Sequence, residues 1–207
     1  MEREPGEQRT LEILEAIEAR RDVTQRRLAD QLGVALGLAN SYLRRCVRKG
    51  LVKIQQAPAN RYFYYLTPQG LAEKSRLTAE YLRTSFDYYH RAGESIGVCF
   101  ALCQARGWRR LLLAGMSEIS EIASIRAHDL DIEVLGTLDL GAKVERFIGR
   151  PVWTSTAAAP PCDALLFTAL AEPLELHAAL LAAYPAERVL VPEILRPVLE
   201  APPAVEA

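Results

Sequence analysis

Basic side chains crowd one stretch of this chain. Between Arg20 and Arg61 the sequence has ten lysines and arginines but only two acidic residues, which gives the stretch a net charge of +8. A dense cationic block of this kind attracts a polyanion, above all the phosphates of nucleic acid. Residues 1–92 carry a net charge of +5, whereas residues 93–207 carry a net charge of −6. We therefore expect a polyanionic partner for the first half only.

A second stretch with chemical potential, LLLAGMSEISEIASI at residues 111–125, changes from an apolar run to a helical pattern at a glycine. Such a step holds phosphates in many nucleotide sites, because the start of a helix presents free N–H groups. Gly115 supplies the first glycine of a GxGxxG fingerprint, but Ser117 and Ser120 occupy the other two positions. Glu118, in the first helical turn, would repel a phosphate. A ligand here is therefore expected to be neutral or cationic.

The ligand set predicted for this second site consists of residues at the ends of two strands, namely Gly115, Ser117, Glu118, Ser120 and Asp139. Asp139 ends the next strand, where such folds hold a ribose diol. The alternative is a helix that caps itself with Ser117 and binds no ligand, with Asp139 acting as a turn residue.

The other reactive residue types form no catalytic constellation. The serines lack a GxSxG elbow, and no histidine has a carboxylate or thiol partner at metal-ligand spacing. The four cysteines lack CxxC spacing and lie in apolar or helical patterns, which favours buried, reduced thiols; a redox pair of Cys99 and Cys103 is the alternative. We expect no enzyme and no metal, and the sequence leaves any cofactor unknown.

The basic block lies on a recognisable order of elements. Helical spacing predicts a first helix over residues 9–20 and a short second helix, QRRLADQLG, capped by Thr24. Gly33 then makes a turn before a third helix, ALGLANSYLRRCVRKG, whose expected inward residues are Leu38, Tyr42, Leu43 and Val47. The runs LVKIQQ and RYFYYLT, joined by APAN, predict a β-hairpin. A helix-turn-helix followed by a hairpin is a winged helix.

The stretch NRYFYYLTPQGL resembles the wing-to-helix junction of MarR-type regulators, in which an arginine of the wing precedes an LTxxG step. The resemblance covers roughly residues 10–92, although this chain has only one short helix ahead of the motif. It implies that the third helix offers to base edges Leu36, Gly37, Asn40, Ser41 and Arg44. It places near phosphates Arg45, Arg48 and Lys49, with Asn60 and Arg61 at the wing tip.

Two of these side chains suit particular bases. Asn40 could make a bidentate contact to adenine, and Arg44 could make one to guanine. Two other interpretations remain open: a solvated basic face, and a winged helix that binds protein.

A long helix is expected to follow, with Pro68 near its first turn and Gly93 past its end. Its apolar stripe must be covered, either by the winged helix or by the same helix of a second chain. The stripe consists of Leu71, Leu77, Tyr81, Leu82, Phe86 and Tyr89. A homodimer would match a palindromic operator.

Strands alternate with helices after Gly93, which predicts a small parallel sheet covered on both faces. The expected strands are RRLLLAG, IEVLGTLD, the edge-like RPVW, DALLFTAL and ERVLVP. This half resembles a shortened, degenerate Rossmann-type domain and is similar to the nucleotide-binding modules of sugar-modifying enzymes. The pieces that carry the resemblance are LLLAGMSEIS, Gly136–Asp139 and IGRPVW.

The predicted fold class is α/β overall, with four parts. Residues 1–67 form an α+β winged helix-turn-helix, residues 68–92 a connecting helix, residues 93–199 a Rossmann-like sensor or oligomerisation domain, and residues 200–207 a flexible tail. We expect a transcription regulator that binds double-stranded operator DNA as a homodimer and senses a small-molecule effector. No apolar run approaches a membrane span and the acidic start is no signal peptide, so we expect no membrane partner and a cytoplasmic location. The alternatives are an enzyme acting on a nucleotide-linked substrate and a protein-binding adaptor.

Overall fold

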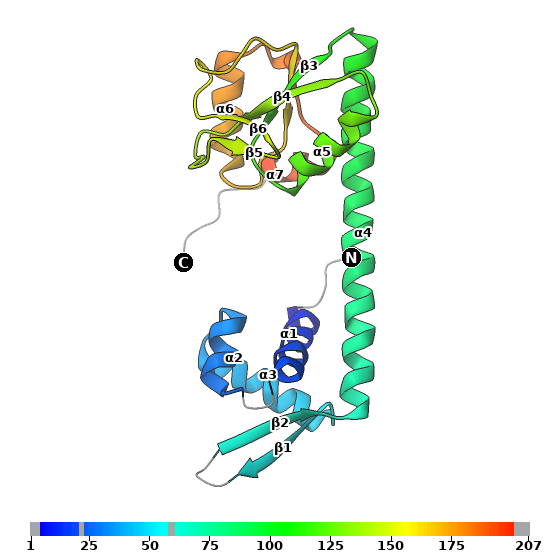
Figure 1. Ribbon diagram of the computed structural model, residues 1–207, viewed down its shortest axis with the longest axis vertical. Coiled ribbons are helices and arrows are strands. Elements are labelled where there is room, and N and C mark those ends of the chain that lie inside the picture. The colour runs from blue at the N-terminus through cyan, green and yellow to red at the C-terminus, as the bar shows by residue number, and fades with distance from the viewer. Residues whose placement is uncertain (1–4, 21–22, 58–60, 201–207) are drawn as a thin grey trace. The chain divides into compact units, whose positions relative to one another are not determined.

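The computed structural model describes residues 5–20, 23–57 and 61–200, which fall into two compact units (Figure 1). The N-terminal unit ends at Ser85 and the C-terminal unit begins at Phe86. The N-terminal unit contains α1 (Pro5–Ala19), α2 (Gln25–Leu32), α3 (Leu36–Arg48), β1 (Val52–Ala57) and β2 (Arg61–Leu66). Helix α4 (Pro68–Ala105) belongs partly to each unit. No helix among the described residues is long and apolar enough to cross a membrane.

The predicted boundaries of α2 are confirmed. The Thr24 side chain accepts a hydrogen bond from the Arg27 N–H, and Gly33 ends the helix with φ 59°, a conformation that glycine adopts without a Cβ clash. Arg9 of α1 donates from Nη1 to the Leu32 carbonyl at 2.7 Å, which satisfies a backbone group at the end of α2. Local signals in the sequence and one tertiary contact thus define the same helix.

The three helices and the hairpin share one apolar core. Leu14 and Ile17 of α1, Leu28 of α2 and Leu43 of α3 are almost completely buried in it. Strands β1 and β2 pair in antiparallel register, with Val52 opposite Leu66, and the buried Tyr64 ties the hairpin to the helices. The predicted winged helix is therefore the observed fold of this unit.

The inward face of α3 differs from the prediction at one position. The residues that α3 buries are Ala39, Leu43 and Cys46, whereas Leu38 is 48% exposed. Tyr42 and Val47 are only partly buried. Because each helical residue turns about 100°, the line through residues 39, 43 and 46 leaves Leu38 well to one side. The expectation that Leu38 packs inward is wrong.

Helix α4 does not stop at Gly93 as predicted but continues to Ala105, absorbing the separate helix expected at residues 94–106. Gly93 is a helical residue with a different task. A Cβ at this position would lie 2.7 Å from Cζ of Arg126, which belongs to α5 (Glu118–His128). Gly93 is therefore an interior residue of α4 with the Arg126 guanidinium beside it.

Ion pairs join α4 to α1 within the N-terminal unit. Arg76 contacts Glu7 of α1 at 3.1 Å and, on its own helix, Glu73 and Glu80. Lys74 pairs with Glu18 of α1. These groups are partly exposed to solvent, so each pair contributes little on its own.

The C-terminal unit is built on a six-stranded sheet in the order β5-β6-β4-β3-β7-β8. The strands are β3 (Arg110–Ala114), β4 (Glu133–Leu138), β5 (Arg146–Phe147), β6 (Arg150–Trp153), β7 (Ala164–Phe167) and β8 (Val189–Leu190). All neighbours pair in parallel except β5 and β6. Counted from β3, the parallel strands follow the order 3-2-1-4-5 of a doubly wound sheet.

Helices cover this sheet on both sides. Figure 1 shows α5 and the C-terminal part of α4 on one side and α6 (Pro173–Ala183) on the other. The central strand β3 is consequently buried from Leu111 to Ala114. The short elements η1 (Ala186–Arg188), η2 (Glu193–Leu195) and α7 (Arg196–Glu200) complete the described chain. The tail predicted at residues 200–207 lies, apart from Glu200, outside the described residues.

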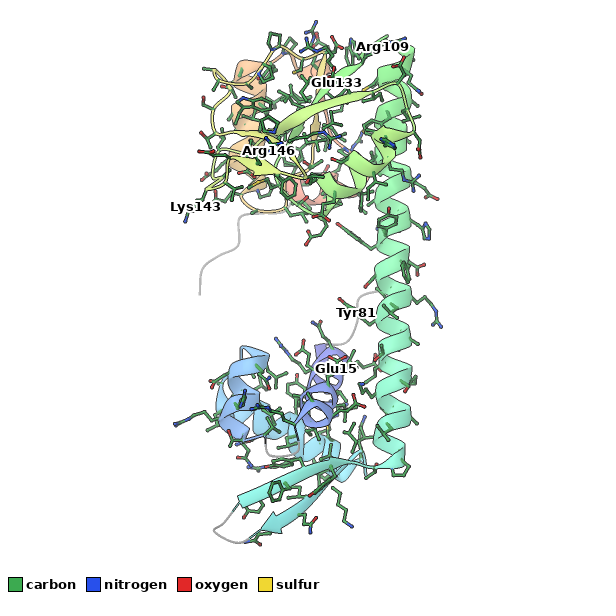
Figure 2. All side chains as sticks on the ribbon, viewed as in Figure 1. Glu15, Tyr81, Arg109, Glu133, Lys143 and Arg146 are labelled. Atoms are coloured by element: carbon green, nitrogen blue, oxygen red, sulfur yellow. The ribbon has the colours of Figure 1, made fainter. Side chains whose placement is uncertain are left out.

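The starts of the strands are held by charged groups. The Asp163 carboxylate accepts hydrogen bonds from the N–H groups of Arg109 and Arg110, at 2.8 and 2.9 Å. These two donors, that of Arg110 first, lower the pKa of Asp163. The Glu133 N–H donates to the Arg109 carbonyl at 2.6 Å, and Figure 2 shows these two residues at the same end of the sheet. Asp163 thus fixes how the chain enters β3.

Candidate nucleic-acid interface

One exposed line of α3 carries the residues best placed to meet DNA. Gly37, Ser41, Arg44 and Arg48 follow each other at spacings of four, three and four, which places them on one side of a helix. All four are exposed, and they lie opposite the buried residues Ala39, Leu43 and Cys46. The fold therefore presents this line outward. They also line a shallow hollow of about 420 Å³.

The N-terminus of α3 has neither a side-chain cap nor a nearby acidic group on its own first turn. Ala35 at its N-cap offers no side-chain hydrogen bond, and its first turn contains no acidic residue. Helices α2 and α5, by contrast, begin with capping hydroxyls from Thr24 and Ser117. A Cβ placed on Gly37 would have no atom within 4 Å among the described residues. The unscreened helix dipole and the open space at Gly37 together suit an approaching phosphate backbone.

Two of the predicted phosphate contacts lie to the sides of the exposed line. Arg45 has its Nη1 beside the start of α1, where a Cβ on Gly6 would lie 3.4 Å away. Lys49 borders a hollow shared with Glu73 of α4, and its charge is among the causes that lower the pKa of Glu73, after a hydrogen bond from Arg76. Both side chains are exposed, but each has a partner region within the N-terminal unit.

Asn40 and the wing tip are less well placed by the structure. Asn40 is half-buried, and its Oδ1 is buried with no hydrogen-bond partner among the described residues. An adenine contact would require its carboxamide to turn outward. Asn60 lies outside the described residues; for Arg61 the structure gives the backbone, which pairs with Ala57 in the hairpin.

Leu38 is a surface residue of α3, although the sequence pattern placed it in the core. Leu36 and Leu38 are 43% and 48% exposed on either side of Gly37. The signal was available, because Ala39 rather than Leu38 is in phase with Leu43 and Cys46.

The second predicted site, at the carboxyl ends of the strands, is closed by its own hydrogen bonds. Ser117 donates to the Thr168 carbonyl at 2.5 Å and accepts from the Ile119 N–H at 3.1 Å. The fully buried Ser120 exchanges hydrogen bonds with the Ser117 backbone. Thr168 in turn donates to the Gly115 carbonyl at 2.6 Å. These contacts join β3 to β7 at the position where a doubly wound sheet opens a ligand crevice.

Gly115 and Asp139 also have roles within the fold. Gly115 has φ 102°, and a Cβ there would lie 2.7 Å from the Ala169 nitrogen. The Asp139 carboxylate accepts hydrogen bonds from the Met116 and Gly141 N–H groups, at 2.9 and 3.1 Å. The structure therefore brings the five predicted ligand residues together, but the polar atoms of four of them are engaged in hydrogen bonds within the fold. Glu118 is the exception, since its side chain is exposed.

Two sequence pieces behind the Rossmann-type resemblance, Gly136–Asp139 and IGRPVW, each contain a glycine with a role in the fold. A Cβ at Gly136 would lie 2.6 Å from the Trp153 ring, so this glycine lets β4 and β6 approach. Ile148 and Gly149 have φ values of 50° and 72° and form the two-residue turn between β5 and β6, as in a type I′ hairpin. Figure 2 shows Arg146 of β5 and Lys143, three residues before it, at the opposite end of the C-terminal unit from Arg109.

The cysteines have the character of buried thiols. Burial raises the pKa values of Cys46, Cys99 and Cys103 to about 11, which keeps these thiols protonated near neutral pH. Across residues 5–20, 23–57 and 61–200, no group of three or more histidine, cysteine or acidic side chains could hold a metal ion.

Comparison with solved structures gives partial likenesses to MarR-family regulators. MepR, a transcription regulator of the Staphylococcus aureus multidrug efflux pump MepA, is 21% identical with a TM-score of 0.36; the match covers 41% of this chain and 62% of MepR. The MarR family regulator SP03579 is 21% identical with a TM-score of 0.33, over 47% of this chain and 73% of its own. The zinc-responsive ZitR of Lactococcus lactis is 19% identical with a TM-score of 0.34, over 45% and 63%. This chain thus spans less than two thirds of MepR and ZitR.

No curated protein matches the chain. Residues 7–53 match the family described as winged helix-turn-helix DNA-binding. This match covers α1, α2 and α3 and reaches the start of β1, and the observed hairpin supplies the wing. The N-terminal unit of this chain is a winged helix-turn-helix domain.

Proposed function

We propose that this chain is a cytoplasmic transcription regulator whose α3 enters the major groove of double-stranded operator DNA. The observation that carries the proposal is the exposed line of Gly37, Ser41, Arg44 and Arg48 on the face of α3 opposite its packing face. The family match of residues 7–53 and the net charge of +8 between Arg20 and Arg61 support it.

Each residue of the line has a distinct task in this proposal. Gly37 lets the helix backbone approach the groove closely, and Ser41 contacts a base edge or phosphate. Arg44, at the centre of the line, makes a bidentate contact to guanine, and Arg48 neutralises a phosphate. Arg45 and Lys49 contact phosphates at the sides of the groove, while Asn40, Asn60 and Arg61 extend the interface.

The proposed regulator is a homodimer. Leu82, Phe86 and Tyr89 recur at spacings of four and three on α4, and they are 47%, 60% and 37% exposed in the single chain. Apolar side chains at this spacing form one stripe of a helix, which a second copy of the same helix would cover. A two-fold pair of recognition helices would then read a palindromic site.

The acidic C-terminal unit is proposed to sense a neutral or cationic metabolite near Glu118. This carboxylate is exposed at the start of α5 and lies near Tyr88, whose pKa is raised by burial first and by Glu118 second. Effector binding would change the spacing of the recognition helices through α4, for which a coupling of about 1–3 kcal/mol is typical. A thermal-shift screen of metabolites, repeated with Glu118→Gln, tests this part. An unchanged response in that variant would remove Glu118 from the effector site.

DNA binding is tested by fluorescence anisotropy on DNA from the promoter region of the protein's own gene, at low salt. Arg44→Ala should cost about 1–3 kcal/mol and relax the preference at one base pair, whereas Arg48→Ala should weaken all sequences alike and reduce the salt slope by about one. Arg106→Ala, an exposed arginine of the C-terminal unit, is the matched control. Absence of binding by the unmodified protein at low salt would refute the proposal.

A further inference from the structure

The first turn of α3 exposes two leucines on a helix that is otherwise polar on its open sides. Leu36 and Leu38 are 43% and 48% exposed, although the helix buries Ala39, Leu43 and Cys46. Successive residues turn about 100°, so the two leucines lie on opposite flanks of Gly37. The first turn of α3 therefore exposes the backbone of Gly37 between the two leucine side chains.

The N-terminal end of α3 is free of covering side chains among the described residues. Helical side chains lean toward the N-terminus, so both leucines project ahead of the helix body. No side chain caps Ala35, and Gly37 has free space around its Cβ position among the described residues. Gly37 is also in line with Arg44, so the leucines flank the residues proposed to enter the groove.

The major groove offers a leucine only one favourable partner. Guanine, cytosine and adenine present hydrogen-bond donors and acceptors there. An aliphatic side chain would remove water from these groups without forming hydrogen bonds in its place. Thymine adds a C5-methyl group, the only alkyl group on these base edges. Leucines held against base edges thus favour thymine.

We propose that Leu36 and Leu38 select thymine at two separate positions of the DNA site through contacts with the C5-methyl groups. The inference rests on the proposed DNA binding by α3 and names what its first turn reads. Two positions are required, because side chains on opposite flanks of Gly37 reach different base pairs.

The test begins with selection of preferred duplexes from random DNA by the full-length protein. Each deoxythymidine in the selected duplex is then replaced by deoxyuridine, which removes the methyl group and keeps the base pair. The unmodified protein should lose about fourfold in affinity at each of two positions, the effect expected for one buried methyl group. Leu36→Ala should abolish the loss at one position, and Leu38→Ala at the other.

The matched control is Leu181→Ala, because Leu181 is a helical leucine of the C-terminal unit with 45% exposure. It should retain both deoxyuridine effects. Circular dichroism melting of the variants shows whether they stay folded, which is expected for leucines this exposed. Specific binding without any deoxyuridine effect, or with effects that survive in both leucine variants, would overturn the inference and leave DNA binding intact. Failure to enrich any sequence would refute the proposed function and this inference with it.

Discussion

The substitution Gly115→Ala should destabilise the C-terminal unit strongly. Gly115 has φ 102°, and an added Cβ would lie 2.5 Å from the Ala169 Cα and 2.7 Å from its nitrogen. The backbone cannot rotate away, because the Gly115 N–H donates to the Leu138 carbonyl at 2.9 Å and its own carbonyl accepts from Thr168. Strain at positive φ costs about 1–3 kcal/mol, and overpacking adds about 1–3 kcal/mol.

The matched control separates these two costs. Gly107 also has positive φ, 70°, but a Cβ there would meet no atom within 4 Å among the described residues. Gly107→Ala should therefore carry the strain alone. The difference between the two variants, about 1–3 kcal/mol, is the cost of the contact with Ala169.

Urea unfolding followed by tryptophan fluorescence measures this difference in the right place. The chain has two tryptophans, Trp108 and Trp153, and both belong to the C-terminal unit. Equal destabilisation by Gly115→Ala and Gly107→Ala would refute the packing argument. Gly115 would then be a glycine with room beside it, as a ligand-binding loop requires.

Three further outcomes are expected. Asp163→Ala should make the free energy of unfolding depend less on pH in acid. Because the pKa of Asp163 is lowered in the folded state, its carboxylate stabilises the fold fully above the ordinary pKa of 3.8, and this stabilisation is lost as the pH falls through the lower folded pKa. Tryptophan fluorescence during unfolding at successive pH values checks this. Thr24→Ala should cost the N-terminal unit about 1 kcal/mol in denaturation followed by circular dichroism, since it removes the cap of α2. Thiol labelling at pH 8 should be slow in the folded protein and fast in denaturant, because burial protects Cys46, Cys99 and Cys103.

Most elements could be predicted from the sequence because their signals are local. Thr24 and Gly33 mark the ends of α2, and apolar runs mark the strands that become β3 and β7. Gly93 was predicted to end the helix because a glycine often follows a helix C-terminus. In the structure α4 continues through Gly93 to Ala105, so the helical patterns on either side of this glycine belong to one helix.

The candidate sites were harder to predict than the fold. Arg44 and Arg48 were selected through the resemblance to MarR-type regulators, and α3 exposes both on one side. Their contact with DNA stays a prediction. The partners of Ser117 could not be foreseen, because its hydrogen bond to Thr168 depends on β7 lying beside β3. Sequence periodicity does not encode which strand becomes that neighbour.

The two outermost strands of the C-terminal sheet, β5 and β8, are each only two residues long. Exposed strand edges present unpaired N–H and carbonyl groups onto which other chains can add and aggregate. Edges this short offer almost no template, so the strongly apolar strands β3 and β7 stay shielded in the interior. Both edges of this six-stranded sheet therefore resist the addition of a strand from another chain.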